Sequence, residues 1–248
     1  MAPLSRRTFA AFLGIAALTP VLGGCASSAA GTASGSGDAG TASDAGAAAS
    51  GSGMRTVDTD KGPVEIPANP QTIVTDYYLG EFLAVDTKPV IASPYALNNP
   101  FLAGLCDGIE ALNTTSAETS LEMIAEKQPD LIVTITEADY DKYAKIAPTV
   151  YIADGTRSDE DLFRYIAGLV NKAEAAEAYI SEFNDKVATV KDEIVGIVGD
   201  RTVSILEVWP QEIYTMGSHF ARGGSILYDM WGLKAPEAVQ GPMVDGDE

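Results

Sequence analysis

The hydrophobic pattern of residues 54–170 alternates between short strand-like runs and short helix-like segments. The strand-like runs are rich in Val, Ile and Thr and are bounded by turn residues; they cover 56–58, 64–66, 72–74, 89–92, 131–135 and 149–152. The helix-favouring segments between them cover 80–85, 120–127 and 140–146. The first two runs flank a Lys-Gly-Pro turn and predict a hairpin. The later alternation predicts a mainly parallel sheet with helices on both faces.

Residues 171–198 show a different pattern and predict one long helix. Apolar residues recur there at steps of three and four, which is one face of a helix, at Ala173, Ala176, Ile180, Phe183, Val187, Val190, Ile194 and Val198. Asn171 with Glu174 predicts an N-terminal capping arrangement, and Gly199 predicts the stop. Such a helix is about 40 Å long. This is more than a crossover within one small lobe requires, so the helix is expected to join two lobes.

The alternation resumes after this helix but the chain soon ends. Strands are predicted at 202–208 and 212–216, and a helix at 223–231. About 45 residues are too few to bury a core of their own. We therefore expect an α/β protein of two lobes whose second lobe is incomplete in this chain.

The first 24 residues have the pattern of an export signal. A basic start with Arg6 and Arg7 precedes an apolar run of roughly a dozen residues, which is too short for a membrane span. The run ends in Leu-Gly-Gly before Cys25, which resembles the lipobox of bacterial lipoproteins. That resemblance implies that the Cys25 thiol receives a diacylglycerol, and that the new N-terminus carries an acyl chain such as palmitate.

The arginine pair also resembles the twin-arginine export motif. Ser5 and Phe9 fit that motif, whereas Ala10 and Ala11 stand where it prefers Leu-Lys. The export route, twin-arginine or general, stays open.

Residues 26–53 contain only Ala, Ser, Gly, Thr and Asp. Such a segment cannot bury apolar area and is expected to be a disordered tether, with a mean reach of about 30 Å. The expected organisation is a signal peptide at 1–24, a lipidated Cys with its linker at 25–53, an N-terminal lobe at 54–170, an inter-lobe helix at 171–199 and a partial C-terminal lobe at 200–248.

The net charge of −19 narrows the range of partners. Removal of residues 1–24 would leave 14 basic against 35 acidic residues. This acidity argues against nucleic acid and against electrostatic adhesion to anionic lipid. Apart from Cys25 the chain has only Cys106, so no disulfide framework is expected, and Cys106 is expected to be a small buried hydrophobe.

Four segments resemble one known family in their order and spacing. They are Gly62-Pro63-Val64-Glu65-Ile66-Pro67, Ser120-Leu121-Glu122-Met123-Ile124 with Gln128-Pro129-Asp130-Leu131-Ile132, Lys145-Ile146-Ala147-Pro148-Thr149-Val150, and Ile213-Tyr214-Thr215-Met216-Gly217 leading to Arg222-Gly223-Gly224. The chain resembles substrate-binding lipoproteins of iron–siderophore ABC importers, in the vitamin B12 and ferric-siderophore group with a rigid helical backbone. The resemblance implies two Rossmann-like lobes joined by one long helix, with some sixty further residues completing the second lobe.

The resemblance also implies a role and a place in the cell. The protein would be a monomer anchored by lipid on the extracytoplasmic face of the cell membrane. It would not be an enzyme and would have no cofactor. It would bind a ferric siderophore and deliver it to an ABC permease.

The residues of the chain favour binding of iron inside a chelate over binding of the bare ion. The chain has one His and no His, Cys and carboxylate cluster with metal-ligand spacing, so no protein metal site is expected. A ferric siderophore fills the iron shell with its own oxygens. The protein then needs aromatic walls and a hydrogen-bond donor.

Six residues are candidates for that ligand surface. Ligands of open α/β sheets bind beyond the carboxyl ends of strands. The candidates follow predicted strands of the first lobe or lie around strand ends of the second; they are Tyr78 and Tyr140 in the first lobe and Trp209, Tyr214, Phe220 and Arg222 in the second. Residues 214–222 resemble the family's loop for hydroxamate siderophores, which has an aromatic residue at Phe220 and an Arg at Arg222. The plainer alternatives are core packing or ordinary loop positions for the aromatic residues, and a surface charge at a helix start for Arg222.

Glu122 has two possible roles. Thr119 and Glu122 form a capping box for a helix start. The resemblance instead implies that Glu122 meets an Arg of the membrane permease.

Other functions stay open. A catecholate complex is highly negative and would need several cations in the site, whereas only Arg222 is placed there. Haem would use His219 with Met216 nearby, and a corrinoid is a further ligand of the same fold. An exported Rossmann-type enzyme lacks its Gly-x-Gly-x-x-Gly sequence after a strand. A surface adhesion lipoprotein would explain the tether but not the alternating pattern.

Overall fold

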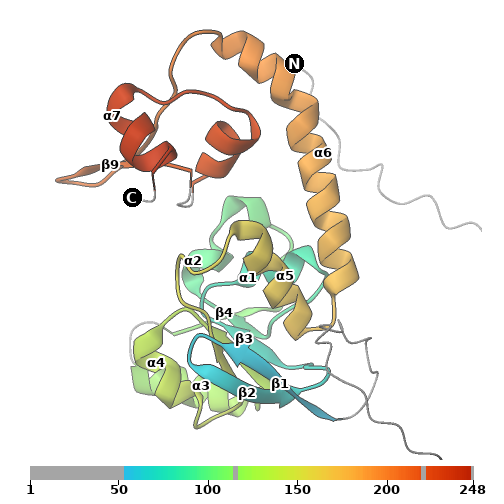
Figure 1. Cartoon of the computed structure of the whole chain (residues 1–248). Helices are drawn as coiled ribbons and strands as arrows, with labels where there is room; N and C mark the ends of the chain where they lie inside the picture. Colours follow the sequence, from blue (N-terminus) through green and yellow to red (C-terminus); the bar gives the residue numbers. More distant parts are fainter. Residues whose placement is uncertain (1–52, 114–116, 219–221, 247–248) are drawn as a thin grey trace, which may run out of the picture. The chain divides into compact units, whose positions relative to one another are not determined.

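The computed structural model describes residues 53–113, 117–218 and 222–246 (Figure 1). The expected export signal, Cys25 and most of the linker lie outside these ranges, as do His219 and Phe220. Across the described ranges, no helix combines the length and the apolar character that crossing a membrane requires.

The described chain opens with the predicted hairpin. Strand β1 (Met54–Thr59) pairs antiparallel with β2 (Gly62–Pro67), and Gly62 takes a positive φ of 100° at the turn. Arg55 ties the hairpin to the rest of the lobe, because its guanidinium donates to the carbonyls of Gly168 and Leu169 at 2.7 and 2.8 Å.

A five-stranded sheet forms the centre of the N-terminal lobe. Its strand order is β5-β4-β3-β6-β7, and every pairing is parallel. The strands are β3 (Ile73–Thr75), β4 (Ile91–Ala92), β5 (Glu110–Ala111), β6 (Leu131–Thr134) and β7 (Thr149–Tyr151). The central strands β3 and β6 are buried along their whole length, as strands with both faces covered must be. The predicted parallel sheet is confirmed.

Helices pack on both faces of this sheet (Figure 1). The helices of this lobe are α1 (Leu79–Ala84), α2 (Pro94–Leu97), α3 (Ala117–Glu126), α4 (Glu137–Tyr143) and α5 (Asp159–Leu169). One core contains the hairpin, α1, α5 and the start of the next helix, with Phe82 and Ile166 fully buried. A second core contains Ile124 of α3 and Tyr143 of α4. Helix α4 begins three residues before its predicted start.

Helix α6 (Ala173–Val198) is 26 residues long, so the predicted long helix is confirmed. Gly199, with φ of 58°, ends it as expected. The predicted N-terminal capping by Asn171 is wrong. Asn171 takes a positive φ of 57° after α5, and its side-chain amide donates to the carbonyl of Ala68. Lys172 is the N-cap, without a side-chain capping bond.

The residues after α6 form a smaller unit. Strands β8 (Ile205–Val208) and β9 (Ile213–Met216) lie where strands were predicted, but they pair antiparallel as a hairpin. Their four-residue connection explains this, because parallel neighbours need a much longer crossover. A π-helical segment (Ser225–Met230), α7 (Glu237–Val239) and a second π-helical segment (Gln240–Val244) follow.

Residues 230 and 231 of this unit each take part in a hydrogen bond with the middle of α6. Trp231 Nε1 donates to the Val187 carbonyl at 3.0 Å, and Lys191 Nζ donates to the Met230 carbonyl at 2.7 Å. The domain boundaries given above stay a prediction.

Candidate functional site

The loop after β3 is held in place by a hydrogen-bond network at the carboxyl end of the sheet. Thr75 Oγ1 accepts from the backbone N–H groups of Tyr77 and Tyr78 at 3.4 and 3.1 Å. The Asp76 carboxylate accepts from Thr134 Oγ1 at 2.5 Å and from the Ile135 N–H at 3.1 Å. These bonds join the ends of β3 and β6, where ligands of open α/β sheets bind.

The two adjacent tyrosines of this loop differ in exposure, and Tyr78, which was predicted to contact the ligand, is the buried one. Tyr78 is only 2% exposed, and its hydroxyl donates to the Ile152 carbonyl at 3.2 Å, so it is a core residue. Burial raises the pKa of Tyr78. Tyr77 is 47% exposed and meets Tyr78 edge-on at 5.5 Å between ring centroids. Tyr77, not Tyr78, therefore offers an aromatic surface at this edge.

Tyr140 lies within α4. Its ring packs edge-on against Tyr151 at 6.3 Å. Lys61 Nζ lies 5.9 and 5.6 Å from the centroids of these two rings and pairs with the Glu137 carboxylate at 2.5 Å. A ligand contact of Tyr140 stays a prediction.

Trp209 and Tyr214 project from the β8–β9 hairpin. Trp209 is 56% exposed in the turn, and Tyr214 is 47% exposed on β9. The Tyr214 hydroxyl donates to the Glu212 carboxylate, and this bond raises the pKa of Tyr214. Neither ring belongs to a core of the described residues, and a ligand contact of either stays a prediction.

Arg222 lies in the turn before the first π-helical segment, with a positive φ of 75°. Its Nη2 atom is 2.9 Å from Glu207 Oε1, and this bond raises the pKa of the guanidinium. The turn passes very close to the end of β9. A Cβ at Gly224 would lie 1.8 Å from the Gly217 carbonyl oxygen, so only glycine fits there. Arg222 is thus an ion-paired side chain on a tightly placed turn.

Glu122 is exposed on α3. The capping-box alternative is wrong, because α3 begins at Ala117 and Thr119 lies inside it rather than before it. The permease-docking role of Glu122 stays a prediction.

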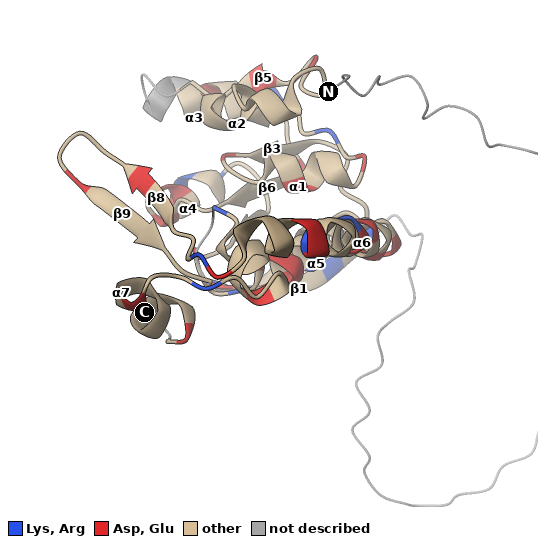
Figure 2. Ribbon diagram, turned by 90° about the horizontal axis from the view of Figure 1, so that it is seen from above, with Lys and Arg blue, Asp and Glu red and all other residues tan. Residues whose placement is uncertain are grey.

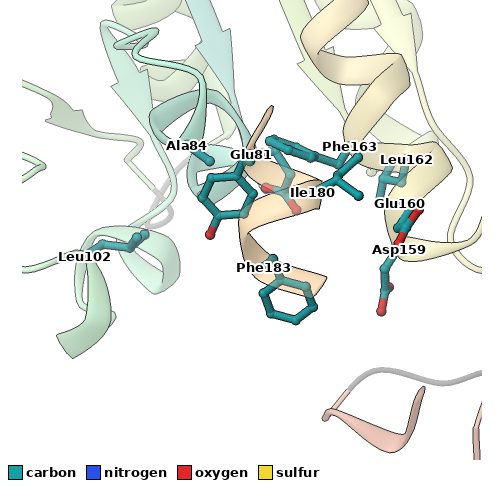
Figure 3. Close-up of a pocket in the computed structure, with 11 residues that line it drawn as sticks. Glu81, Ala84, Leu102, Asp159, Glu160, Leu162, Phe163, Ile180 and Phe183 are labelled. Atoms are coloured by element: carbon teal, nitrogen blue, oxygen red, sulfur yellow. The ribbon is translucent and has the colours of Figure 1, made fainter. Parts of the chain in front are cut away.

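A groove that sequence reasoning missed lies between α1, α5 and α6 (Figure 3). Its volume is about 390 Å³. Its walls are apolar apart from three carboxylates, and they comprise Gly80, Glu81, Ala84, Leu102, Asp159, Glu160, Leu162, Phe163, Tyr179, Ile180 and Phe183. A smaller hollow beside Tyr77 and Asp154 shares Leu162 with it, so the groove adjoins the carboxyl end of the sheet.

Metal-ligating side chains do not gather in groups of three or more anywhere in the described ranges. Cys106 is a free thiol, partly buried beside Leu102. Its Sγ atom is 3.4 Å from the Leu102 carbonyl oxygen.

Comparison with known proteins gives one family and a consistent set of relatives. The family described as "Periplasmic binding protein" matches residues 87–238. The iron(3+)-hydroxamate-binding proteins YxeB and FhuD of Bacillus subtilis are 34% and 32% identical to the chain, over 78% and 77% of its length. The matches cover 60% and 61% of those relatives, so the chain spans about three fifths of their length.

A solved structure shows the same fold. It is a periplasmic binding protein component of a Fep/Fec-like ferrichrome ABC transporter from Bacillus subtilis, with 30% identity and a TM-score of 0.70. The match covers 77% of this chain and 70% of that one.

Proposed function

Because this chain belongs to the periplasmic binding protein family, we propose that it captures a ferric hydroxamate siderophore and delivers it to an ABC importer. The observation that carries the proposal is the similarity to two proteins named for iron(3+)-hydroxamate binding, at 34% and 32% identity. The proposed role is binding and delivery without catalysis.

The proposed ligand surface combines aromatic rings with one guanidinium. It comprises Tyr77 in place of Tyr78, together with Tyr140, Trp209, Tyr214, Phe220 and Arg222. Exposed rings offer flat apolar faces to the organic shell of the siderophore. The planar fork of Arg222 suits the oxygens around the iron.

The local charges support a hydroxamate over a catecholate ligand. Three basic side chains of the described residues near these positions have carboxylate partners: Lys61 pairs with Glu137, Arg157 with Asp60 and Arg222 with Glu207. A highly negative catecholate complex would need free cations. Ferric hydroxamates carry far less negative charge and need only the donors that Arg222 offers.

Quenching of tryptophan fluorescence tests the proposal, because Trp209 is exposed in the proposed surface. We expect saturable quenching with ferrichrome and none with ferric enterobactin. Haem and cyanocobalamin serve as the alternative ligands. Saturable binding of one of these, without binding of ferrichrome, would replace the hydroxamate proposal by that ligand class.

Arg222 provides the residue-level test. Arg222→Ala is expected to weaken ferrichrome binding by roughly tenfold to a hundredfold, since a charge-assisted hydrogen bond is lost. Arg222→Lys should restore only part of the affinity, because an ammonium lacks the planar fork. Arg201→Ala is the matched control, because Arg201 donates to carbonyls at the end of α6. Unchanged affinity in Arg222→Ala would remove this residue from the site.

The lipid anchor and the permease contact are separate parts of the proposal. The Leu-Gly-Gly-Cys sequence supports acylation of Cys25 and attachment to the outer face of the cell membrane. Cys25→Ala should release the protein from the membrane fraction; retention after a high-salt wash would contradict the anchor.

Glu122 can be tested for docking in transport assays. Glu122→Ala should lower siderophore uptake by cells while leaving the affinity for ferrichrome unchanged, because the residue is exposed on α3 and is not part of the proposed ligand surface. Normal uptake with the variant would exclude a docking role for this residue.

A further inference from the structure

The groove between α1, α5 and α6 combines a rigid apolar wall with acidic groups. Phe163 and Tyr179 meet edge-on at 5.2 Å between ring centroids, which fixes one side. Tyr179 and Phe183 remain 47% and 38% exposed at its surface. A groove of about 390 Å³ holds a short alkyl chain with room to spare.

The carboxylate of Glu81 points into this groove beside Ile180 (Figure 3). Burial raises the pKa of Glu81, and the nearby Asp159 carboxylate adds to the effect. Neither Glu81 nor Asp159 forms a salt bridge with another residue of the described ranges. Asp159 is exposed at the start of α5, where Figure 2 shows acidic positions in red beside α6.

The third carboxylate is already partnered. Glu160 lies 3.1 Å from Arg164 Nη2 and accepts from Asn184 Nδ2 at 3.1 Å. Glu81, which is partly buried, and the exposed Asp159 therefore line an apolar groove without an ion-pair partner among the described residues. A partly buried carboxylate without an ion-pair partner attracts positive charge, so a cationic ligand group would be stabilised here and an anionic one repelled.

We propose that this groove is a subsite for a cationic side arm of the siderophore, an alkyl chain that ends in a primary ammonium. The carbon chain lies against Leu162, Ile180 and Phe183. The ammonium pairs with Glu81, and Asp159 adds attraction at the mouth. The inference rests on the proposed function, and it adds a preference for hydroxamates with a positively charged arm.

The position of the groove supports this link. Leu162 lines both the groove and the hollow beside Tyr77. Glu81 follows Tyr77 by four residues, on the first turn of α1. An arm extending from a ligand at Tyr77 therefore reaches the groove directly.

Two forms of one siderophore provide the test. Ferrioxamine B is a linear ferric trihydroxamate with a free pentylammonium arm, and its N-acetylated form has the same iron core with an uncharged arm. Both are titrated against the full chain by quenching of tryptophan fluorescence. We expect the amine form to bind about tenfold more tightly, as one charge-assisted contact predicts.

Substitutions of the groove carboxylates test whether the groove causes this difference in affinity. Glu81→Gln should abolish the preference while leaving the affinity for the acetylated form unchanged. Asp159→Asn, at an exposed position that cannot disturb the core, should reduce the preference by a smaller factor. Glu65→Gln on the exposed face of β2 is the control and should keep the full preference.

The outcomes separate the two proposals. Equal affinities of the two forms for the unmodified protein would overturn the groove subsite and leave hydroxamate binding intact. The same holds if Glu81→Gln weakens both forms equally. Absence of binding by either form and by ferrichrome would overturn the proposed function and the subsite together.

Discussion

The N-terminal lobe and the unit after α6 contain the same kinds of strand residues but bury them very differently. In the lobe, Leu131 and Ile132 of β6 are 0% and 1% exposed. In the later unit, Val208 of β8 and Ile213 of β9 are 73% and 68% exposed. The lobe has helices on both faces of a parallel sheet, whereas β8 and β9 form a two-stranded hairpin. Residue type determines where strands form. The layers packed on a strand determine how much that strand contributes to the stability of the fold.

The two regions should therefore differ in how they depend on single side chains. The lobe has two extended cores, while the later unit has a small one around Tyr228, Ala235 and Val239. Local opening should occur first in the later unit, because it buries the least apolar surface.

The largest expected effect tests this contrast directly. Phe82→Ala removes a fully buried ring from the lobe core and should lower the free energy of unfolding by about 3–5 kcal/mol. Val208→Ala, at an exposed strand position, should change it by less than about 0.5 kcal/mol. Urea denaturation of the two variants gives both numbers. Similar losses in the two variants would show that the contrast in burial does not govern stability.

Weakening the attachment of the later unit to α6 should lower the free energy of unfolding by a smaller amount. Trp231→Phe removes the hydrogen bond from Nε1 to the Val187 carbonyl and should cost about 1 kcal/mol. Amide hydrogen exchange should accelerate in residues 201–246 and stay unchanged in the lobe. Trp209→Phe is the matched control, since Trp209 is an exposed turn residue. Faster exchange in the lobe as well would mean that the two regions open as one unit.

An ion pair at the edge of the lobe should contribute a similar or smaller amount to the free energy of unfolding. The Asp60 carboxylate accepts from both terminal nitrogens of Arg157, at 2.8 and 3.0 Å, and from the Ala153 N–H at 2.7 Å. The hydrogen bond from Arg157 lowers the pKa of Asp60 below its ordinary value. Because this pair is partly exposed, Asp60→Asn should cost about 0.5–1 kcal/mol at pH 7.

The pH dependence of this effect follows from the lowered pKa. A carboxyl whose pKa is lower in the folded state stabilises it fully above its unfolded pKa of about 4, and loses that stabilisation as the pH falls through the lower value. The difference in melting temperature between the unmodified protein and Asp60→Asn should therefore be smaller at pH 3 than at pH 7. A difference that is larger at pH 3 would contradict a lowered pKa of Asp60 in the folded protein.

The smallest effect concerns the exposed hairpin. Ile213→Thr keeps a β-branched residue on β9 and should change the free energy of unfolding by less than about 0.5 kcal/mol. It should reduce self-association, because it removes an exposed apolar side chain. Light scattering at increasing protein concentration measures this. Unchanged scattering would show that the hairpin does not drive association.

The sequence predicted the elements with strong local patterns. The β-branched runs of β3, β6 and β7 and the periodicity of α6 were readable without the fold. Helix α5 was missed although Ser158 caps it and three acidic residues occupy its first turn. Strand β5 could not be predicted, because Glu110 and Ala111 are both exposed and gain strand geometry only by pairing with β4.

The candidate site was harder to predict than the fold. Tyr77 and Tyr78 are adjacent and chemically alike, and only the packing of the lobe shows which ring is buried. The groove at Glu81 brings together residues from α1, α5 and α6 that lie up to about a hundred positions apart. A glutamate in a short helix gives no signal of such surroundings until the three helices are placed together.

The hydrogen bonds around Asp76 bear on how fast the proposed ligand is captured. The backbone N–H of Tyr77 is bonded to Thr75, and the neighbouring Asp76 is bonded to Thr134, so this loop is fixed to the ends of two strands. Association slows when binding must wait for a segment to rearrange, and an already ordered loop avoids that delay. Capture of the proposed siderophore should therefore need no ordering of this loop before the ligand binds.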